Sequence, residues 1–269
     1  MRRWLSPGYL YFWLLAIFLY LPIFLLLLFS FNDSATLTFP LRTFTLRWYE
    51  ALLEANELLE SLRNSIIVGA ISSVVATILG TMAAIGVVRF NFIGRNAFVA
   101  LAAMPLVIPS VVLGVALLIL FRQIVDVELT LWTVGLGHVV INIPIVMLIV
   151  AARLAGFDEN LEEAAMDLGA TYWQAQWRIT LPIIIPALVA AFLTAFTTSF
   201  DEYAMSVFIV GTDATLPVYM YSQLRFPRRL PIIVTLGAII MISSILIIMS
   251  AERLRRLGQH DAAVPGAHD

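Results

Sequence analysis

The chain has 269 residues, of which 61% are hydrophobic and only 13% are charged. A soluble fold of this length cannot bury so much apolar surface, so the composition predicts one integral membrane domain and leaves no length for a second, soluble one. The lack of cysteine excludes disulfides and thiolate sites, the lack of lysine excludes a Walker A nucleotide site, and a net charge of −2 gives no basic field for nucleic acid.

Six apolar stretches are each long enough to cross a bilayer as a helix. Their approximate bounds are 9–31, 62–88, 97–121, 131–152, 183–200 and 231–251. We therefore expect an all-α integral membrane protein, with one transmembrane domain over residues 1–257 and a disordered polar tail over 258–269. An even number of spans places both termini on one side of the membrane. That side is expected to be cytoplasmic, because arginines cluster at both ends of the domain and at the hairpin between the second and third spans.

Single residues in the second, third and fourth spans predict how these helices pack. Pro105 and Pro109 free backbone carbonyl groups, so a bend or break is expected in the third span. His138 and Asn142 lie one helical turn apart, and a buried pair satisfied by neighbouring helices is favoured over a binding site. Close helix packing is expected at three glycines of the second span, which are Gly69, Gly80 and Gly86.

The inner connection between the fourth and fifth spans, residues 153–182, carries helical signals of its own. Two short helices are expected there. Asp158 can cap the first helix, and Gly169 can end it in a left-handed conformation. Thr171 with Gln174 three residues later has the pattern of a capping box for the second helix.

The first of these two helices combines a small apolar face with an acidic surface. The apolar positions, at spacings that place them on one face, are Leu161, Ala164, Ala165 and Leu168. Helices that lie on an inner membrane surface are normally rich in basic residues, because the inner leaflet is anionic. Docking into a protein groove is therefore favoured over contact with lipid.

The spacing in this loop resembles the EAA motif of ABC importer permeases, the binding-protein-dependent type I family. Glu163-Ala164-Ala165 is followed after three residues by Gly169, and then by Ile179 and Leu181-Pro182. The resemblance covers essentially the whole six-span chain. It implies the type I ABC importer permease fold, in which a cytoplasmic coupling helix of this loop docks in a cleft of a separate ATPase subunit.

The resemblance also implies partners. These are two copies of an ABC ATPase, a second homologous permease subunit, a periplasmic or extracellular solute-binding protein, and the lipid of a bacterial inner membrane. For the permease pair, a heterodimer is favoured over two copies of this chain. The chain itself is expected to bind no cofactor, because ATP and magnesium belong to the ATPase. The residues expected to couple this chain to the ATPase are Glu162, Glu163, Ala164, Ala165, Asp167 and Gly169.

The fifth span ends in two adjacent carboxylates, which are costly near hydrocarbon. Threonines at helical spacing lead up to them and form one polar stripe, which is expected to line a pathway rather than face lipid. The alternative is that the acids lie at a solvated outer helix end. A cation held between carboxylates and aromatic rings is chemically reasonable here. The predicted pathway residues are Thr194, Thr197, Thr198, Phe200, Asp201, Glu202 and Tyr203.

Three segments resemble the second permease of spermidine/putrescine importers, namely 162–171, 199–202 and 215–217. The resemblance implies a polyamine substrate, which suits paired acids. The sequence departs from that branch over 225–229, where three arginines stand near the outer mouth. They suit docking to an acidic surface of the binding protein, or they indicate another substrate, such as an opine, an amino-acid derivative or an anion.

Two other classes of protein compete with a permease as interpretations of the sequence. An intramembrane hydrolase would need a nucleophile with its base or a metal set, and the chain has neither an H-E-x-x-H nor a G-x-S-x-G motif. No catalytic or metal-ligating residue is therefore predicted. A secondary transporter or channel needs no inner loop of this kind and commonly shows internal repeats, which the sequence lacks.

Overall fold

A computed structural model describes residues 7–34 and 38–261, and this part of the chain is almost entirely helical. The elements, in chain order, are α1 (Pro7–Ser30), α2 (Arg47–Glu54), α3 (Asn56–Arg89), α4 (Arg95–Val107), α5 (Ser110–Ile119), η2 (Leu120–Ile124), α6 (Leu131–Ala155), α7 (Asn160–Asp167), α8 (Tyr172–Ala175), η3 (Gln176–Thr180), α9 (Leu181–Asp201), α10 (Ser206–Ile209), α11 (Leu216–Gln223), η4 (Pro227–Arg229) and α12 (Leu230–Asp261). Residues 258–261 of the predicted tail are thus helical, and the remainder of the tail lies outside the described residues.

Contacts divide the chain into two compact units, which are described separately. The first unit comprises residues 1–56 and 222–269, and the second comprises residues 57–221. The single domain predicted over 1–257 stays a prediction.

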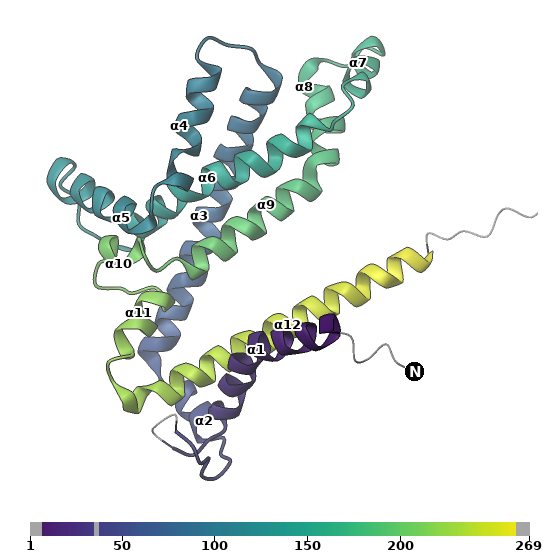
Figure 1. Cartoon of the computed structure of the whole chain (residues 1–269). Helices are drawn as coiled ribbons and strands as arrows, with labels where there is room; N and C mark the ends of the chain where they lie inside the picture. The colour runs from purple at the N-terminus through teal and green to yellow at the C-terminus, as the bar shows by residue number, and fades with distance from the viewer. Residues whose placement is uncertain (1–6, 35–37, 262–269) are drawn as a thin grey trace, which may run out of the picture. The chain divides into compact units, whose positions relative to one another are not determined.

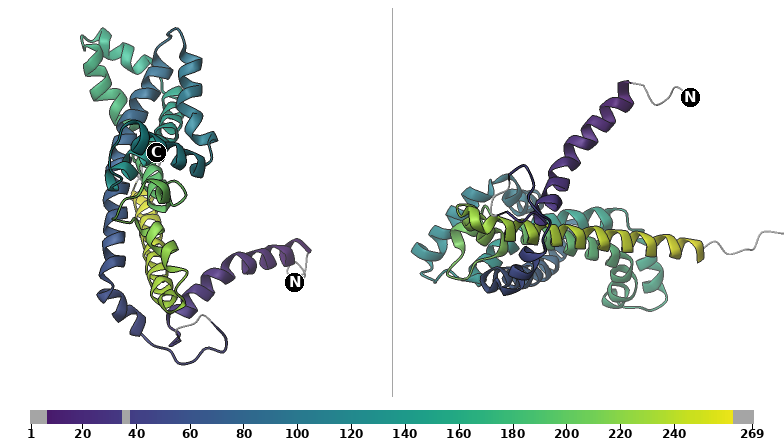
Figure 2. Two further views of the ribbon diagram at one scale, coloured as in Figure 1. Left: turned by 90° about the vertical axis from the view of Figure 1, so that its left-hand side faces the viewer. Right: turned by 90° about the horizontal axis from the view of Figure 1, so that it is seen from below.

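The first unit is built on α1 and α12, which pack against each other. The two helices diverge toward the N-terminal end of α1 in both views of Figure 2. α2 packs on α12 and buries Trp48 and Leu52. The Trp48 indole nitrogen donates a hydrogen bond to the Asn32 carbonyl oxygen at 2.9 Å, which ties α2 to the end of α1. Most side chains between residues 10 and 21 are apolar and exposed, as expected of a helix that meets lipid or another chain.

The second unit is built around α3, α6 and α9. α3 has 34 residues and runs along the unit, while α6 and α9 lie side by side (Figure 1). α4 packs on α6, and α10 packs on both α5 and α6. Two buried apolar clusters hold these helices together. The first includes Ala76, Val146, Val150, Ile184 and Ala191, and the second includes Val68, Val134, Met205 and Ile209.

Five described helices are long and apolar enough to cross a membrane, and α4 with α5 makes a sixth if the bent pair counts as one span. The pair is bent by 105° at Ile108 and Pro109. Pro109 precedes α5 with an extended backbone, and the residue before a proline is disfavoured in the helical conformation. The predicted break in the third span is therefore confirmed.

Two of the three glycines predicted to allow close packing do so on α3. A Cβ atom added to Gly80 would lie 2.7 Å from the Val146 Cβ and 2.9 Å from the Ile143 carbonyl oxygen of α6. One added to Gly69 would lie 3.2 Å from the Phe196 ring of α9. For Gly86 the prediction is wrong, because its Cβ would meet no atom within 4 Å in the described part of the chain. α3 is thus held closely against both α6 and α9.

Candidate functional site

The loop between α6 and α9 folds as its sequence predicts. Asp158 accepts a hydrogen bond from the Asn160 backbone nitrogen at 3.1 Å, just before α7. Gly169 follows α7 with φ of +91°, in the left-handed region that favours glycine. The Thr171 hydroxyl and the Gln174 side chain bond reciprocally to each other's backbone nitrogen, which forms the expected capping box of α8. These local signals fix where α7 begins and ends.

A buried carboxylate joins α7 to two other elements of the second unit. The Arg89 guanidinium, at the end of α3, donates to Glu162 Oε1 and to Glu159 Oε1, each at 2.8 Å. Glu162 Oε1 also accepts from Gln176 Nε2 at 3.1 Å and from the Thr180 hydroxyl, both on η3. We call these five residues the inner latch.

Burial makes the central pair of the inner latch different from a surface ion pair. The side chains of Arg89 and Glu162 are each only 9% exposed. The guanidinium also lies over the Phe157 ring, with its central carbon 5.1 Å from the ring centroid. Glu162 was predicted among the coupling residues, and its carboxylate lies inside the chain against Arg89. Its coupling role stays a prediction.

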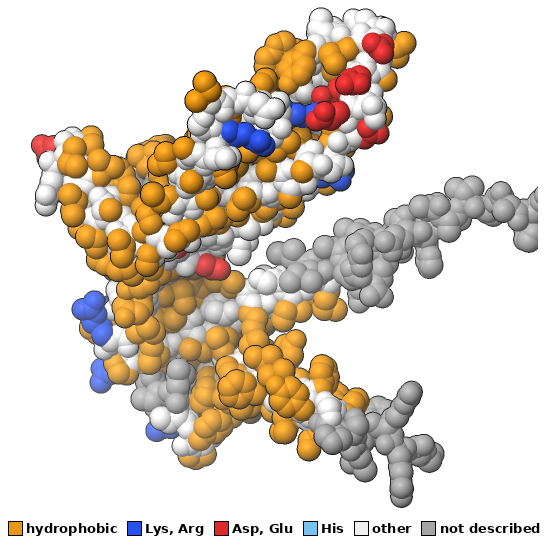
Figure 3. Space-filling view, turned by 45° about the horizontal axis from the view of Figure 1, so that its top comes forward, with side chains coloured by type: hydrophobic (Ala, Val, Ile, Leu, Met, Phe, Trp, Pro, Cys, Tyr) orange, Lys and Arg blue, Asp and Glu red, His pale blue; other side chains and the backbone are white. Residues whose placement is uncertain are grey.

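The outer face of α7 is exposed and carries both apolar and acidic side chains. Leu168 is 90% exposed and Leu161 is 45% exposed, on the face that also carries Ala164. Glu163 and Asp167 are exposed as well, and acidic side chains gather around this end of the unit in Figure 3. Exposed leucines beside free carboxylates are typical of a surface that docks into a protein groove.

The threonine stripe of α9 is less polar than its sequence suggests. The hydroxyls of Thr194, Thr197 and Thr198 each donate to the carbonyl oxygen four residues earlier, at 2.8–2.9 Å. Their donors are therefore already satisfied within the helix. Thr194 and Thr197 are nevertheless exposed on the surface of the second unit, and their oxygens can still accept hydrogen bonds.

The two carboxylates at the end of α9 have different surroundings. Asp201 is the last residue of α9, is exposed, and has no ion-pair partner within the described ranges. Glu202 accepts a hydrogen bond from the Met205 backbone nitrogen at 2.8 Å and so holds the turn that enters α10. Of the two acids, Asp201 is the one whose carboxylate is left to meet a ligand.

The aromatic residues beside these acids are engaged with other rings. Phe200 stacks on Phe196 with 6.1 Å between centroids, and Tyr203 packs on Tyr221 with 4.5 Å between centroids. We call residues 199–206, which connect α9 to α10, the acidic corner. Its aromatic rings are positioned by these neighbours, and its free charge comes from Asp201.

A buried histidine holds both ends of the acidic corner. His138 of α6 is 1% exposed, and its Nδ1 and Nε2 atoms form hydrogen bonds with the hydroxyls of Ser199 and Ser206 at 2.5 and 2.8 Å. The Ser199 hydroxyl also forms a hydrogen bond with the Ser72 hydroxyl of α3 at 3.0 Å. We call these four residues the corner clamp. The prediction that neighbouring helices satisfy His138 is confirmed.

Asn142 does not share in this network. It is fully buried, yet neither its amide nitrogen nor its amide oxygen has a hydrogen-bond partner among the residues the structure describes. The prediction of a satisfied pair with His138 is therefore wrong for Asn142. The polar partners of His138 come instead from α9 and α10.

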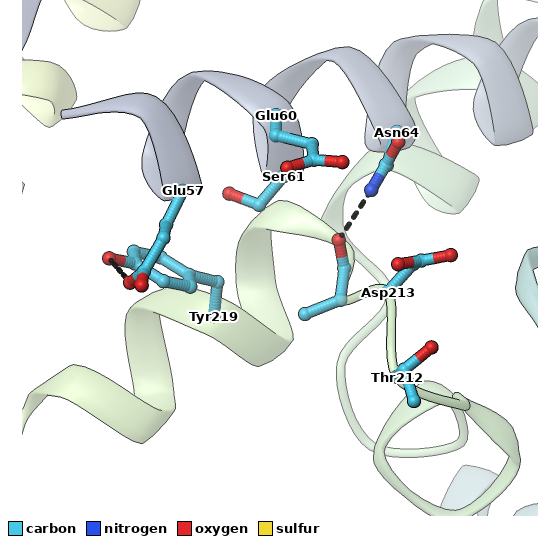
Figure 4. A pocket seen from close by; sticks show the side chains of 8 residues that line it. Glu57, Glu60, Ser61, Asn64, Thr212, Asp213 and Tyr219 are labelled. Atoms are coloured by element: carbon cyan, nitrogen blue, oxygen red, sulfur yellow. Dashed lines mark hydrogen bonds between the residues drawn. The ribbon is translucent and has the colours of Figure 1, made fainter. Parts of the chain in front are cut away.

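Two cavities of the second unit lie elsewhere. One, of about 280 Å³, is lined by carboxylates at the start of α3 and in the connection before α11 (Figure 4). Its lining includes Glu57, Glu60 and Asp213, and the Tyr219 hydroxyl donates to the Glu57 carboxylate at 3.2 Å. The other, of about 610 Å³, is an apolar groove between α3 and the elements α8, η3 and α9. Within the described part of the chain, no group of three or more His, Asp or Glu side chains is arranged to hold a metal ion.

Sequence reasoning missed the residues that join these regions to α3. Arg89 was read as the end of the second span and a marker of orientation, and Ser72 and Ser206 were not singled out. The sequence did carry one signal for the inner latch. An arginine ends an apolar helix, and a long acidic loop begins about 65 residues later. No spacing within one helix could have indicated the corner clamp, because its members come from α3, α6, α9 and α10.

The chain resembles known transport proteins over most of its length. The family described as "Binding-protein-dependent transport system inner membrane component" matches residues 76–257. The Escherichia coli (strain K12) putrescine transport system permease protein PotI is 37% identical over 215 residues, which are 77% of this chain and 76% of that protein. The spermidine/putrescine transport system permease protein PotC of the same strain is 30% identical over 240 residues, which are 89% of this chain and 90% of PotC.

Two solved structures share the fold. A chain of a bacterial ABC transporter involved in the import of the acidic polysaccharide alginate aligns with a TM-score of 0.65 and 18% identity, over 95% of this chain and 98% of that one. A chain of the inward-facing MetNI methionine ABC transporter aligns with a TM-score of 0.57 and 22% identity, over 78% of this chain and 97% of that one. At these identities the likeness shows the fold alone, which is that of ABC transporter permeases.

Proposed function

The chain belongs to the family of binding-protein-dependent transport system inner membrane components, and from this premise we propose that it conducts a polyamine or related amine and couples its passage to a separate ATPase. It is a multi-pass membrane protein and the permease subunit of an ABC importer. The substrate class and the surfaces that contact partners are our proposals. Cytoplasmic placement of both termini is part of the proposal and follows from the arginine distribution.

The proposed ATPase contact is the outer face of α7. Leu161 on this eight-residue helix and Leu168 directly after it lose favourable burial in water unless a partner covers them. Ala164 between them allows a close approach of the partner backbone. Glu163 and Asp167 flank this row and can pair with arginine or lysine on the ATPase. Gly169 fixes the turn after the helix, so it contributes through geometry rather than contact.

The proposed substrate contact is Asp201. This exposed carboxylate at the end of an apolar span is the main observation in favour of a cationic substrate. A charge in that place is costly unless water or a cation meets it. The carboxylates of Glu57, Glu60 and Asp213 around the cavity of Figure 4 add negative potential to the same unit, which favours the approach of cations. PotI and PotC, whose names specify putrescine and spermidine transport, support the same class.

Further partners complete the proposal. Two ATPase copies, a second homologous permease subunit and a solute-binding protein are required, and ATP with magnesium belongs to the ATPase rather than to this chain. The exposed arginines around η4, which are Arg225, Arg228 and Arg229, are proposed to meet an acidic surface of the binding protein. We assign these arginines to contact with the binding protein rather than with the substrate, because Asp201 is proposed to bind a cationic substrate.

The substrate proposal is tested with Asp201→Asn in the complete transporter reconstituted in proteoliposomes. Loss of the carboxylate removes the charge that compensates a protonated amine, so uptake of labelled putrescine should fall at least ten-fold. ATPase co-purification should stay at the wild-type level. Asp126→Asn is the matched control, because Asp126 is an exposed acid with φ of +54°, a conformation that asparagine tolerates.

Wild-type uptake by the Asp201 variant would contradict the substrate contact. A solute-binding protein of the same transporter that binds neither putrescine nor spermidine in calorimetry would contradict the substrate class. The proposal would then pass to an amino-acid derivative, an opine or an anion, for which the arginines around η4 offer complementary charge.

The coupling proposal is tested with Glu163→Arg, which reverses an exposed charge on α7. Repulsion and bulk at the docking face should abolish co-purification of the ATPase while leaving membrane insertion unchanged. Glu128→Arg is the matched control, because it makes the same charge reversal at an exposed residue just before α6 begins, at the end of α6 away from α7. Retention of the ATPase by Glu163→Arg would show that the docking face lies elsewhere.

A further inference from the structure

α7 is joined to its neighbours along the chain by two short connections. It has eight residues, and it is preceded by a turn at Gly156 and followed by the left-handed Gly169. A helix of that length is about 12 Å long and has little surface with which to fix its own orientation. If only these connections held it, a force applied to its outer face would rotate α7 before it moved the spans.

The inner latch supplies a third attachment, and it comes from a helix distant in sequence. Arg89 lies 70 residues before Glu159 and 73 residues before Glu162, and it holds one carboxylate oxygen of each at 2.8 Å. The two carboxylates belong to the start of α7 and to the residue before it. A planar guanidinium can hold two carboxylates in fixed directions, which a lysine ammonium cannot do.

The latch also reaches the start of the fifth span. Glu162 Oε1 accepts from Gln176 and Thr180 of η3, which leads directly into α9. One carboxylate therefore ties α7 to α3 and to α9 at the same time. With both side chains of the central pair only 9% exposed, removal of Arg89 leaves the Glu162 carboxylate buried without a cation.

α3 carries this attachment deep into the unit. Gly80 lets α3 approach α6 within van der Waals distance, and Gly69 does the same toward α9. Ser72 of α3 forms a hydrogen bond with Ser199, a member of the corner clamp and the first residue of the acidic corner. Seventeen residues separate Arg89 from Ser72, which corresponds to about 26 Å along a helix. α3 thus connects α7 to the corner that carries Asp201.

We propose that Arg89 is a positioning residue that locks α7 to α3, so that a push on α7 moves α3, α6 and α9 together with the acidic corner. This inference rests on the proposed function, because it needs the ATPase contact on α7. Arg89 contacts neither substrate nor ATPase in this arrangement, and it acts through Glu159 and Glu162.

The test uses Arg89→Gln in the complete transporter, with two readouts. The chain contains no cysteine, so Met82→Cys on α3 and Met166→Cys on α7, both exposed and outside the proposed docking face, can carry a spin-label pair without background labelling of this chain. The distance distribution between the labels should be narrow in the wild type and at least twice as broad in the variant. The number of putrescine molecules imported per ATP hydrolysed should fall at least ten-fold, while ATP hydrolysis continues.

Arg95→Gln is the matched control. Arg95 begins α4, and its side chain donates to the Val87 carbonyl oxygen near the end of α3 at 2.7 Å, with no ion pair to α7 among the described residues. The control removes one arginine from the same membrane edge, so it should keep both the narrow distribution and the wild-type import ratio. An unchanged ratio or an unchanged distribution in Arg89→Gln would overturn the inference.

A merely structural role for Arg89 predicts a different outcome. It would lower the amount of assembled complex and leave the import ratio of the surviving complex at the wild-type value, which would also overturn the inference. If Arg89→Gln does not assemble, Arg89→Lys decides, because an ammonium keeps the charge but lacks the planar fork that fixes the directions of two carboxylates, and it should give an intermediate ratio. Failure of the wild-type chain to bind an ATPase would instead contradict the proposed function, so the two failures are distinguishable.

Discussion

The inner latch and the corner clamp perform the same structural task with different chemistry. Each joins an element of the loop or corner to α3, because a buried polar residue of that element, Glu162 or Ser199, bonds a side chain of α3. The latch uses a charged pair, Arg89 and Glu162, at the end of α3. The clamp uses the histidine and serine hydroxyls, within the stretch where α6 and α9 lie side by side.

The difference follows from the surroundings of the two sites. Ions are expensive far from water, whereas neutral hydroxyl and imidazole groups need only their hydrogen bonds. At the end of α3, Glu159 remains exposed, and its partner guanidinium is shared with the buried Glu162. The comparison indicates that the inner latch is a strong ionic attachment that can still open, because part of it reaches water. The neutral hydrogen bonds of the corner clamp instead hold one fixed conformation. Substitutions in and beside the two networks test this reading, beginning with the largest expected effect.

Removal of the central carboxylate of the latch should have the largest effect on stability. Glu162→Ala leaves Arg89 buried with Glu159 alone and leaves Thr180 without its acceptor, so the free energy of unfolding should fall by about 3 kcal/mol. Denaturant unfolding of the purified chain in mild detergent measures the change. Glu163→Ala, on the exposed face of the same helix, is the control and should stay within about 0.5 kcal/mol of the wild type. Equal losses in the two variants would contradict the difference between the two acids.

Replacement of the clamp histidine should cost less, because no charge is left behind. His138→Leu removes two hydrogen bonds and leaves the Ser206 hydroxyl buried without its partner, so the free energy of unfolding should fall by about 2 kcal/mol. Asn142→Leu, one turn away, should have the opposite sign and stabilise the isolated chain by about 1 kcal/mol, since both amide atoms are already unpartnered in the described structure. A loss in the Asn142 variant as large as that in the His138 variant would show that Asn142 has a polar partner after all.

The sequence was informative wherever a signal is local. The break at Pro109, the capping box of Thr171 and Gln174, and the left-handed Gly169 depend on residues within a few positions of one another, and all three occur as predicted. The EAA spacing is local too, and it led to the family. Each of these signals acts through backbone geometry that a short segment determines by itself.

The side-chain partners could not be predicted because they depend on which helices become neighbours. Glu162 and Glu163 are adjacent acids with the same propensities, and only the position of Arg89 makes one buried and the other exposed. His138 has the right spacing for Asn142 yet bonds Ser199 and Ser206. The predicted pathway roles of Thr194, Thr197, Thr198 and Asp201 stay predictions, because the exposure of a side chain does not by itself identify what binds it.

The contact that α3 makes with α6 lies between the two regions, and Gly80→Ala tests it. The added Cβ would lie 2.7 Å from the Val146 Cβ, so the helices must separate, and the free energy of unfolding should fall by about 1.5 kcal/mol. Gly86→Ala is the control on the same helix, where the Cβ meets open space, and it should stabilise by about 0.5–1 kcal/mol through helix propensity. Identical effects of the two substitutions would exclude a close contact at Gly80. Unfolding in mild detergent measures both.

The smallest expected effect concerns the local signals, which lie outside both networks. Thr171→Ala removes the side-chain acceptor for the Gln174 backbone nitrogen and should lower the free energy of unfolding by about 1 kcal/mol. Because Thr171 is exposed and touches neither Arg89 nor Glu162, its effect should add to that of Glu162→Ala in the double variant, within about 0.5 kcal/mol. The same unfolding measurement on the three variants provides the cycle. A clear departure from additivity would mean that the cap of α8 and the inner latch act as one unit, and that the charged attachment extends further along the loop than its five residues.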